Sequence, residues 1–254
     1  MVFSSTYDAF VPSNYTQFFS LGIQPHYVPF NTLNASFIPD LAQQASFTYA
    51  KRFTPPTVFL HCLRVFYFGL AMLYNGFPSQ TPGVAQISFN ELSSRFYHAA
   101  VLHDIAWSSD PIVTADPAHG MTFEMQGAFM SYAHLHLTAP AYTAEQVGDI
   151  AESITLHTST WAGGNSSATQ ILLAIAVDFD AVGYDAFGPG SLDFLVNRTT
   201  VAEIEAQFPR GDLAAEIIQI MEKQFEEKPN SLLSHFPGGP EGFYEVLRVP
   251  PIVD

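Results

Sequence analysis

The stretch LLAIAVDFDAVG, residues 172–183, joins an almost wholly apolar segment to two aspartates. Apolar residues occupy every face from Ala168 to Val182, which is typical of a helix buried inside a protein. Burying the carboxylate of Asp180 in such a helix costs free energy unless it is paired or bound to a cation. Asp178, two residues earlier, points to another face of the helix. The stretch therefore predicts a central buried helix in which Asp180 has a partner.

Signals for further helices lie on both sides of this segment. Thr54-Pro55-Pro56 is typical of a helix start, and apolar residues follow at steps of three and four residues to about Tyr74. Capping-box patterns at Ser88 and Thr143 open two more helices. The predicted helices beyond the first cover Phe89 to about Ile105, about Thr122 to Leu137, Thr143 to His157, Ala168 to Val182, and segments opening at Thr200 and at Asp212. Nothing alternates at period two over a strand's length, so we predict an all-α bundle.

The chain divides into three parts by composition. Residues 1–45 are rich in proline and aromatic side chains, which predicts an extended arm over the core with a short helix near Phe37–Tyr49. We expect residues 46–236 to form one helical domain and residues 237–254 to form a wrapping tail. With 48% apolar residues, the 254-residue chain can bury a sizeable core. Aromatic residues that we expect to be exposed in the arm favour a homo-oligomer; examples are Tyr15, Phe18 and Phe19.

Charge and cysteine content exclude several classes of function. The formal net charge is −15, and residues 96–197 contain no Lys or Arg, so nucleic acid is not an expected partner. Cys62 is the only cysteine, which excludes an internal disulfide and a cysteine-based zinc site. We find no run of about 18 uncharged apolar residues and no signal-peptide pattern at the start. These features predict a cytoplasmic protein with no membrane partner.

Four ionisable residues in the predicted helices have the chemistry of metal ligands. His61 lies within the first helix, His103 and Asp104 end the second, and Asp180 lies in the central one. Imidazoles with carboxylates suit Zn²⁺ or Fe²⁺, and ligands from separate helices are usual in helical bundles. Each residue also has a structural interpretation. A lone helical histidine is more often a core or surface residue, Asp104 can end a helix, and Asp180 can bind a helix terminus.

The order of these residues is similar to that of the HD-domain superfamily of metal-dependent hydrolases, and closer to one branch, the fungal cyanamide hydratases. Seven segments resemble motifs of that branch, in the same order, over about residues 50–236. They are HCLRVFYFG (61–69), VLHDI (101–105), MTFEMQG (121–127), DIAESITLH (149–157), LLAIAVDFDAVG (172–183), Phe208-Pro209-Arg210 and KPNSLLSH (228–235). The match of LLAIAVDFDAVG selects Asp180 over Asp178.

The resemblance implies a divalent metal, zinc or alternatively iron, held by His61, His103, Asp104 and Asp180. It implies hydration of cyanamide to urea, for which such a cation supplies hydroxide at neutral pH. His157 would protonate the substrate nitrogen, and Glu124 would orient the water or a ligand histidine; with Asp104 they are the candidate catalytic residues. Their structural interpretations are a solvated acid early in a helix for Glu124 and a helix C-cap for His157.

The chain departs from the branch in three places. Ala106-Trp107 stands where the branch has glycine, Leu156-His157-Thr158-Ser159 replaces an R-H-x-D motif, and Asn230 replaces a tryptophan. These changes alter the surroundings of the predicted ligands. A small neutral substrate is expected, and a larger nitrile, an isonitrile or an amide is compatible with the changes. Two further alternatives are a hydrolase of phosphate monoesters, which the scarcity of basic residues disfavours, and a non-catalytic scaffold stabilised by metal.

Overall fold

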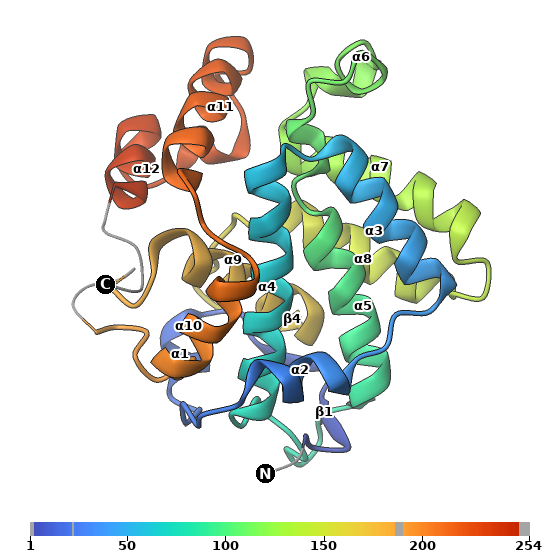
Figure 1. Ribbon diagram of the computed structural model, residues 1–254, viewed down its shortest axis with the longest axis vertical. Coiled ribbons are helices and arrows are strands. Elements are labelled where there is room, and N and C mark those ends of the chain that lie inside the picture. Colours follow the sequence, from blue (N-terminus) through green and yellow to red (C-terminus); the bar gives the residue numbers. More distant parts are fainter. Residues whose placement is uncertain (1–2, 22, 186–189, 249–254) are drawn as a thin grey trace.

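The central element of the fold is α9 (Ala168–Val182), whose residues from Ala168 to Ala176 are all buried. It packs against α4 (Pro56–Tyr74), α5 (Phe89–Leu102) and α8 (Ala144–Leu156), as Figure 1 shows. The predictions of an all-α bundle and of a buried central helix are therefore confirmed. The computed structural model describes residues 3–21, 23–185 and 190–248.

Further helices surround this centre. α7 packs on α8, α3 on α5, and both α10 and α11 on α4. Two predictions among them are confirmed, since helices begin directly after Thr122 and directly after Asp212. The elements of this outer layer are α3 (Leu41–Phe53), α6 (Pro111–Thr114), α7 (Phe123–Thr138), α10 (Arg198–Gln207), α11 (Leu213–Glu227), α12 (Gly239–Leu247) and the 3-10 helices η1 (Ile105–Trp107), η2 (Pro117–Gly120) and η3 (Leu232–His235).

Capping side chains fix the N-terminal ends of several helices. The Thr143 side chain accepts a hydrogen bond from the Gln146 N–H, and the Gln146 side chain completes a capping box. Ser88 caps α5 through the Glu91 N–H. Two predicted ends need correction. α5 ends at Leu102 rather than near Ile105, and α10 begins at Arg198 because Asn197, not Thr200, accepts the capping bond from the Thr199 N–H.

The residues that we predicted as an extended arm contain regular structure. Strands of three residues each form two antiparallel pairs, β1 (Thr6–Asp8) with β3 (Gln86–Ser88) and β2 (Phe10–Pro12) with β4 (Asn165–Ser167). They were missed because three residues are too few to show an alternating pattern. Two helices, α1 (Tyr15–Phe19) and α2 (Phe30–Ser36), follow, and the predicted boundary between residues 45 and 46 falls inside α3.

The expectation of exposure is wrong for the three aromatic residues of the arm that we named, although two others are exposed, Phe10 at 54% and Tyr27 at 50%. Phe18 is 1% exposed, and its ring centroid lies 5.5 Å from that of Phe77. Phe19 and Tyr15 are half-buried, and the Phe19 ring contacts Phe194. The arm uses these side chains to bind its own core. The formation of a homo-oligomer stays a prediction, but the three residues on which we based it do not form an exposed surface.

The predicted wrapping tail also contains a helix. α12 packs against α11 and η3, with Tyr244 and Leu247 buried. A helix places the apolar side chains of residues 237–248 on one face, and that face packs against α11 and η3. The rest of the predicted tail, residues 249–254, lies outside the described residues.

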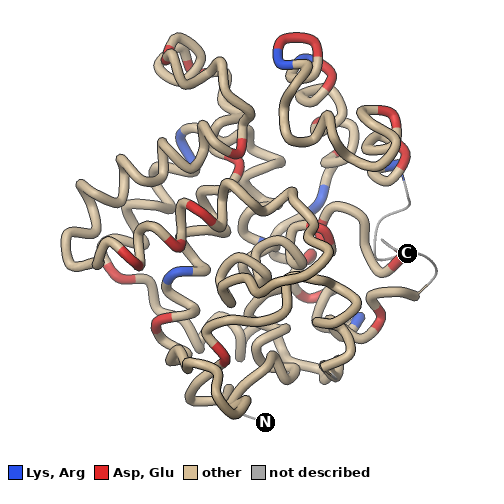
Figure 2. The backbone as a smooth tube through the Cα atoms, turned by 180° about the vertical axis from the view of Figure 1, so that it is seen from behind, with Lys and Arg blue, Asp and Glu red and all other residues tan. Residues whose placement is uncertain are grey.

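By length and composition alone, α4 meets the requirement for a membrane-spanning helix. Our search for uncharged runs did not identify it, since the helix contains Arg64. In the structure 78% of its most apolar window is buried against the other helices, as expected for a core helix. Figure 2 shows acidic residues on most parts of the bundle and few basic ones, in line with the net charge of −15.

Candidate metal centre

Four helices bring the candidate residues to one end of the bundle. His61 lies in the second turn of α4, His103 is the C-cap of α5, and Asp104 follows it directly. His157 is the C-cap of α8, and Asp180 lies near the end of α9. All five side chains are at most 2% exposed. The predicted residues, which are spread over 120 positions of the sequence, therefore occupy one buried region.

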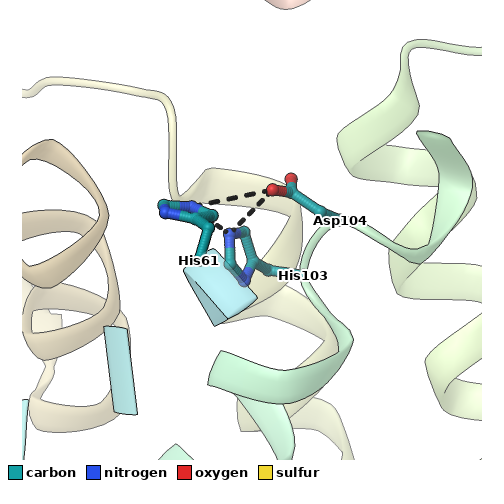
Figure 3. Close-up of side chains that lie close together, drawn as sticks. All are labelled: His61, His103 and Asp104. Carbon is teal, nitrogen blue, oxygen red and sulfur yellow. Dashed lines mark hydrogen bonds and ion pairs between the residues drawn. The ribbon is translucent and has the colours of Figure 1, made fainter. Parts of the chain in front are cut away.

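His61, His103 and Asp104 form the closest group (Figure 3). Nε2 of His61 lies 3.2 Å from Nε2 of His103, and Oδ2 of Asp104 lies 3.1 Å from His103 Nε2 and 3.7 Å from His61 Nε2. One ligand atom from each residue lies within 4.8 Å of the others. Two nitrogens and a carboxylate oxygen at these separations can share one cation.

The hydrogen bonds of the imidazoles define which ring nitrogen is free. His103 Nδ1 lies 2.8 Å from the Ala100 carbonyl oxygen, and His157 Nδ1 lies 2.6 Å from that of Ile154. His61 Nδ1 lies 2.5 Å from Oδ2 of Asp180. Because carbonyl and carboxylate oxygens accept, each Nδ1 carries a proton, and in the neutral ring each Nε2 presents a lone pair. Metal-binding histidines are usually oriented in this way.

Asp104 lacks the donors that a buried carboxylate needs. Within the described part of the chain, neither oxygen accepts a hydrogen bond of normal geometry, although His103 Nε2 is 3.1 Å away. Burial favours the neutral acid, yet the charge of His103 lowers the pKa of Asp104 overall, and the charge of Asp104 raises the pKa of His103 against its burial. A positive charge between the His103 imidazole and the Asp104 carboxylate is therefore favourable. A divalent cation satisfies that demand, and the N and O donors suit zinc or iron.

His157 completes the surroundings of Asp104. Its Nε2 lies 4.0 Å from Oδ1 of Asp104, the oxygen on the other side from His61 and His103. Burial, together with the charge of His103, lowers the pKa of His157 to about 4. The imidazole is therefore neutral near pH 7. His157 is the C-cap of α8, but its buried Nε2 also faces Asp104. Its position therefore suits more than a capping role.

Asp180 is held by arginines and does not belong to the closest group. Arg64 donates from Nε to Oδ1 and from Nη2 to Oδ2, each at 2.9 Å, and Arg210 donates to Oδ1 at 3.0 Å. Burial raises the pKa of Asp180, but the two guanidinium groups lower it well below its usual value. With His61 Nδ1 also bound, Asp180 orients the His61 ring from behind. From the sequence we expected Asp180 to be a direct metal ligand. We did not expect Arg64 and Arg210 to bind its carboxylate.

A signal for these arginines was present in the sequence. Arg64 belongs to the segment HCLRVFYFG, and Arg210 ends the Phe208-Pro209-Arg210 landmark. Arg64 also donates to the carbonyl oxygens of Phe208 and Pro209, which joins the two segments. By contrast, Asp178 points away from the centre and accepts a hydrogen bond of 3.0 Å from the Tyr15 hydroxyl. The structure places these two aspartates on the different helix faces that the sequence predicted.

Glu124 lies beside the centre in the first turn of α7. Its side chain is fully buried, so the interpretation as a solvated acid is wrong. Thr158, next to His157, donates to Oε1 at 2.7 Å, and Thr122 donates to the other oxygen. Burial raises the pKa of Glu124 despite these bonds. A buried carboxyl group with a raised pKa beside a cluster of ionisable side chains is a candidate for proton transfer.

A comparison with known proteins finds two similar proteins of known name. The chain is 27% identical over 180 residues to two proteins of Saccharomyces cerevisiae named Cyanamide hydratase DDI2 and Cyanamide hydratase DDI3. The aligned part covers 71% of this chain and 70% of each relative. No family model matches the chain. Because both relatives are named as enzymes, the similarity favours an enzyme.

Proposed function

We propose that this protein is a metal-dependent hydratase that adds water across the C≡N bond of a small nitrile, with cyanamide converted to urea. The observation that supports it most is the buried Asp104 carboxylate, which lacks hydrogen-bond donors among the described residues and faces the Nε2 atoms of His61 and His103. The names of the two yeast relatives support the choice of reaction.

His61, His103 and Asp104 would hold the metal, zinc or alternatively iron. Such a cation supplies a Lewis acid that makes hydroxide available near neutral pH. Asp180 would act on the metal through His61, because Arg64 and Arg210 already occupy its oxygens. A carboxylate behind a ligand histidine fixes the ring and raises the basicity of its free nitrogen.

Asp104 would orient the attacking water, and His157 would accept its proton. Asp104 Oδ1, which faces His157, accepts a hydrogen bond from the water and orients it. The neutral His157 imidazole takes a proton at Nε2 as the water oxygen bonds to the nitrile carbon, and returns it to the substrate nitrogen. The second proton of water also reaches that nitrogen, which leaves the amide product. Glu124, through Thr158, would keep the His157 segment in place.

A neutral substrate fits the charges of the site better than a phosphate ester. Arg64 and Arg210, the cations beside His61, both bind Asp180. An incoming phosphate would have to displace that carboxylate. With a net charge of −15, the chain also repels polyanions, so we propose a cytoplasmic enzyme without nucleic-acid or membrane partners.

The test is a direct assay of purified protein. Cyanamide should give urea, and the activity should disappear after chelation and return with added zinc or iron. Nucleoside monophosphates should give no inorganic phosphate. Phosphate release without urea formation would replace the proposal with a phosphohydrolase, and metal binding without turnover of any small nitrile or amide would replace it with a scaffold.

A further inference from the structure

A second region of the molecule has the features of a binding site. A cavity of about 730 Å³ lies between α11 and the segment of residues 107–120, which contains α6 and η2. In Figure 1 these are the two neighbouring projections at the top of the bundle. The volume is in the range of pockets that bind small molecules.

Three residues that line this cavity each contain a buried polar side-chain atom without a partner. These atoms are Nζ of Lys228, Nε1 of Trp107 and Oε1 of Gln224, and none of them has a hydrogen bond to any described residue. The three residues are only 5%, 9% and 6% exposed. A buried polar group without a partner is costly, and a buried charge costs more. Such groups in three residues around one cavity indicate a ligand that supplies the partners.

The charges of the cavity favour an anion. Lys223 and Lys228 are two of the three lysines of a chain whose net charge is −15, and both line the cavity with one acid, Glu227. Glu227 lies 3.7 Å from Lys223 and not within ion-pair distance of Lys228. Burial lowers the pKa of Lys228, and the charges of Glu227 and Glu124 partly offset that effect. The cavity is therefore a place where a negative group is attracted within an acidic protein.

The three atoms define the chemistry of the missing partner. An ammonium and an indole N–H both donate, so the ligand must offer acceptors, one of them negatively charged. The Gln224 amide oxygen accepts, so the ligand must also have a donor. We propose that this cavity binds a small carboxylate that carries an N–H or O–H donor, with the carboxylate on Lys228 and Trp107 and the donor on Gln224.

The proposed site borders the reacting groups but includes none of them; its nearest link is Lys228, whose pKa burial lowers and the Glu124 charge partly raises. Trp107 lies three residues after Asp104, and its ring contacts Phe123, which in turn contacts His157. Two aromatic contacts thus stand between the cavity and the centre. Carboxylate binding does not depend on hydratase activity, so each proposal can fail while the other holds.

Fluorescence of Trp107 provides a direct readout. The only other tryptophan, Trp161, is 45% exposed and far along the sequence, so a Trp161→Phe variant isolates the signal from Trp107. N-acetylglycine, which has both the carboxylate and the N–H, should change this signal saturably. N-acetylglycinamide lacks the charge and N-acetylsarcosine lacks the N–H, so both should bind more weakly, by about tenfold or more for the amide. Equal binding of the acid and its amide, or no saturable change, would overturn the proposal.

Variants of Lys228 and Gln224 complete the test. Lys228→Met should weaken N-acetylglycine binding at least about tenfold, and Gln224→Leu should remove the preference over N-acetylsarcosine. The free Lys228→Met protein should unfold at an equal or higher temperature, because an unpaired buried charge is removed. Lys51→Met, at an exposed lysine, is the matched control and should change neither property. A lower unfolding temperature for Lys228→Met alone would show that Lys228 has an internal partner, which contradicts the proposal.

Discussion

Among the described residues, histidines form two buried clusters that differ in the groups available to share hydrogen bonds with them. In the first, His98 and His134 both contact the Ser46 hydroxyl, at 2.8 and 3.0 Å, and His98 also contacts the Tyr142 hydroxyl. In the second, His61 and His103 face each other and Asp104. His98 and His103 lie on the same helix only five residues apart.

Hydroxyl groups explain the difference between the clusters. A hydroxyl can donate to one imidazole and accept from another, so Ser46 and Tyr142 satisfy the first cluster without any added group. The carboxylate of the second cluster accepts only, and the Nε2 atoms around it present lone pairs. A cluster of acceptors needs a cation, whereas a cluster with hydroxyls does not. The comparison therefore separates structural histidines from candidate ligands on one helix.

The largest contrast between the clusters should come from removing the carboxylate. Asp104→Asn should abolish metal retention and, with it, urea formation, because an amide is a poor ligand and one of its ends repels the cation. His98→Gln should keep one metal per chain. Elemental analysis of the purified variants measures both. Retained metal in Asp104→Asn would show that the second cluster is structural like the first.

A smaller effect is expected for His157→Ala. The variant should keep its metal, since His157 lies 4.0 Å from Asp104 and outside the closest group. The rate of urea formation should fall by about 10²–10⁴-fold because the proton carrier is lost. Loss of the metal would instead make His157 a fourth ligand. An unchanged rate would return it to a capping role.

Asp180→Asn should act on the metal indirectly. The variant keeps the shape of the side chain but loses the charge behind His61, so metal affinity should weaken by about 10–100-fold, as is usual for such partners. Competition with a chelator gives the affinity. Asp178→Ala, on the opposite face of α9, is the control and should keep the wild-type affinity. Complete loss in Asp180→Asn would support direct ligation instead, and equal weakening by Asp178→Ala would contradict the helix register.

The first cluster should make the free energy of unfolding depend on pH. Burial lowers the pKa of His98 to about 4, below the value of about 6.5 in an unfolded chain. His98 therefore contributes stability above pH 6.5 that is lost as pH falls towards 4, because the unfolded chain binds the proton more readily. The loss is worth roughly 3 kcal/mol. Urea unfolding at several pH values should show that wild type loses this much more than His98→Gln over that range. Parallel curves would mean that His98 is solvated.

Sequence reasoning predicted the parts of this structure that depend on neighbouring residues. The apolar faces of α9, the capping residue Thr143 and the adjacent pair His103-Asp104 are local signals, and they indicated the helices and the place of the centre. The pairing of Asp180 with Arg210 was out of reach, because it depends on the direction of a side chain 30 residues away. Nor does sequence distinguish His98 from His103, since the hydroxyl that satisfies His98 comes from Ser46 on another helix.

The most direct test of the account is anomalous X-ray scattering from crystals of the protein, measured at the zinc and iron absorption edges. We expect one strong peak about 2.0–2.2 Å from Nε2 of His61, Nε2 of His103 and an oxygen of Asp104. No peak should lie beside His98 and His134. An empty second cluster in metal-supplemented crystals, or a peak at the Ser46 cluster instead, would contradict it.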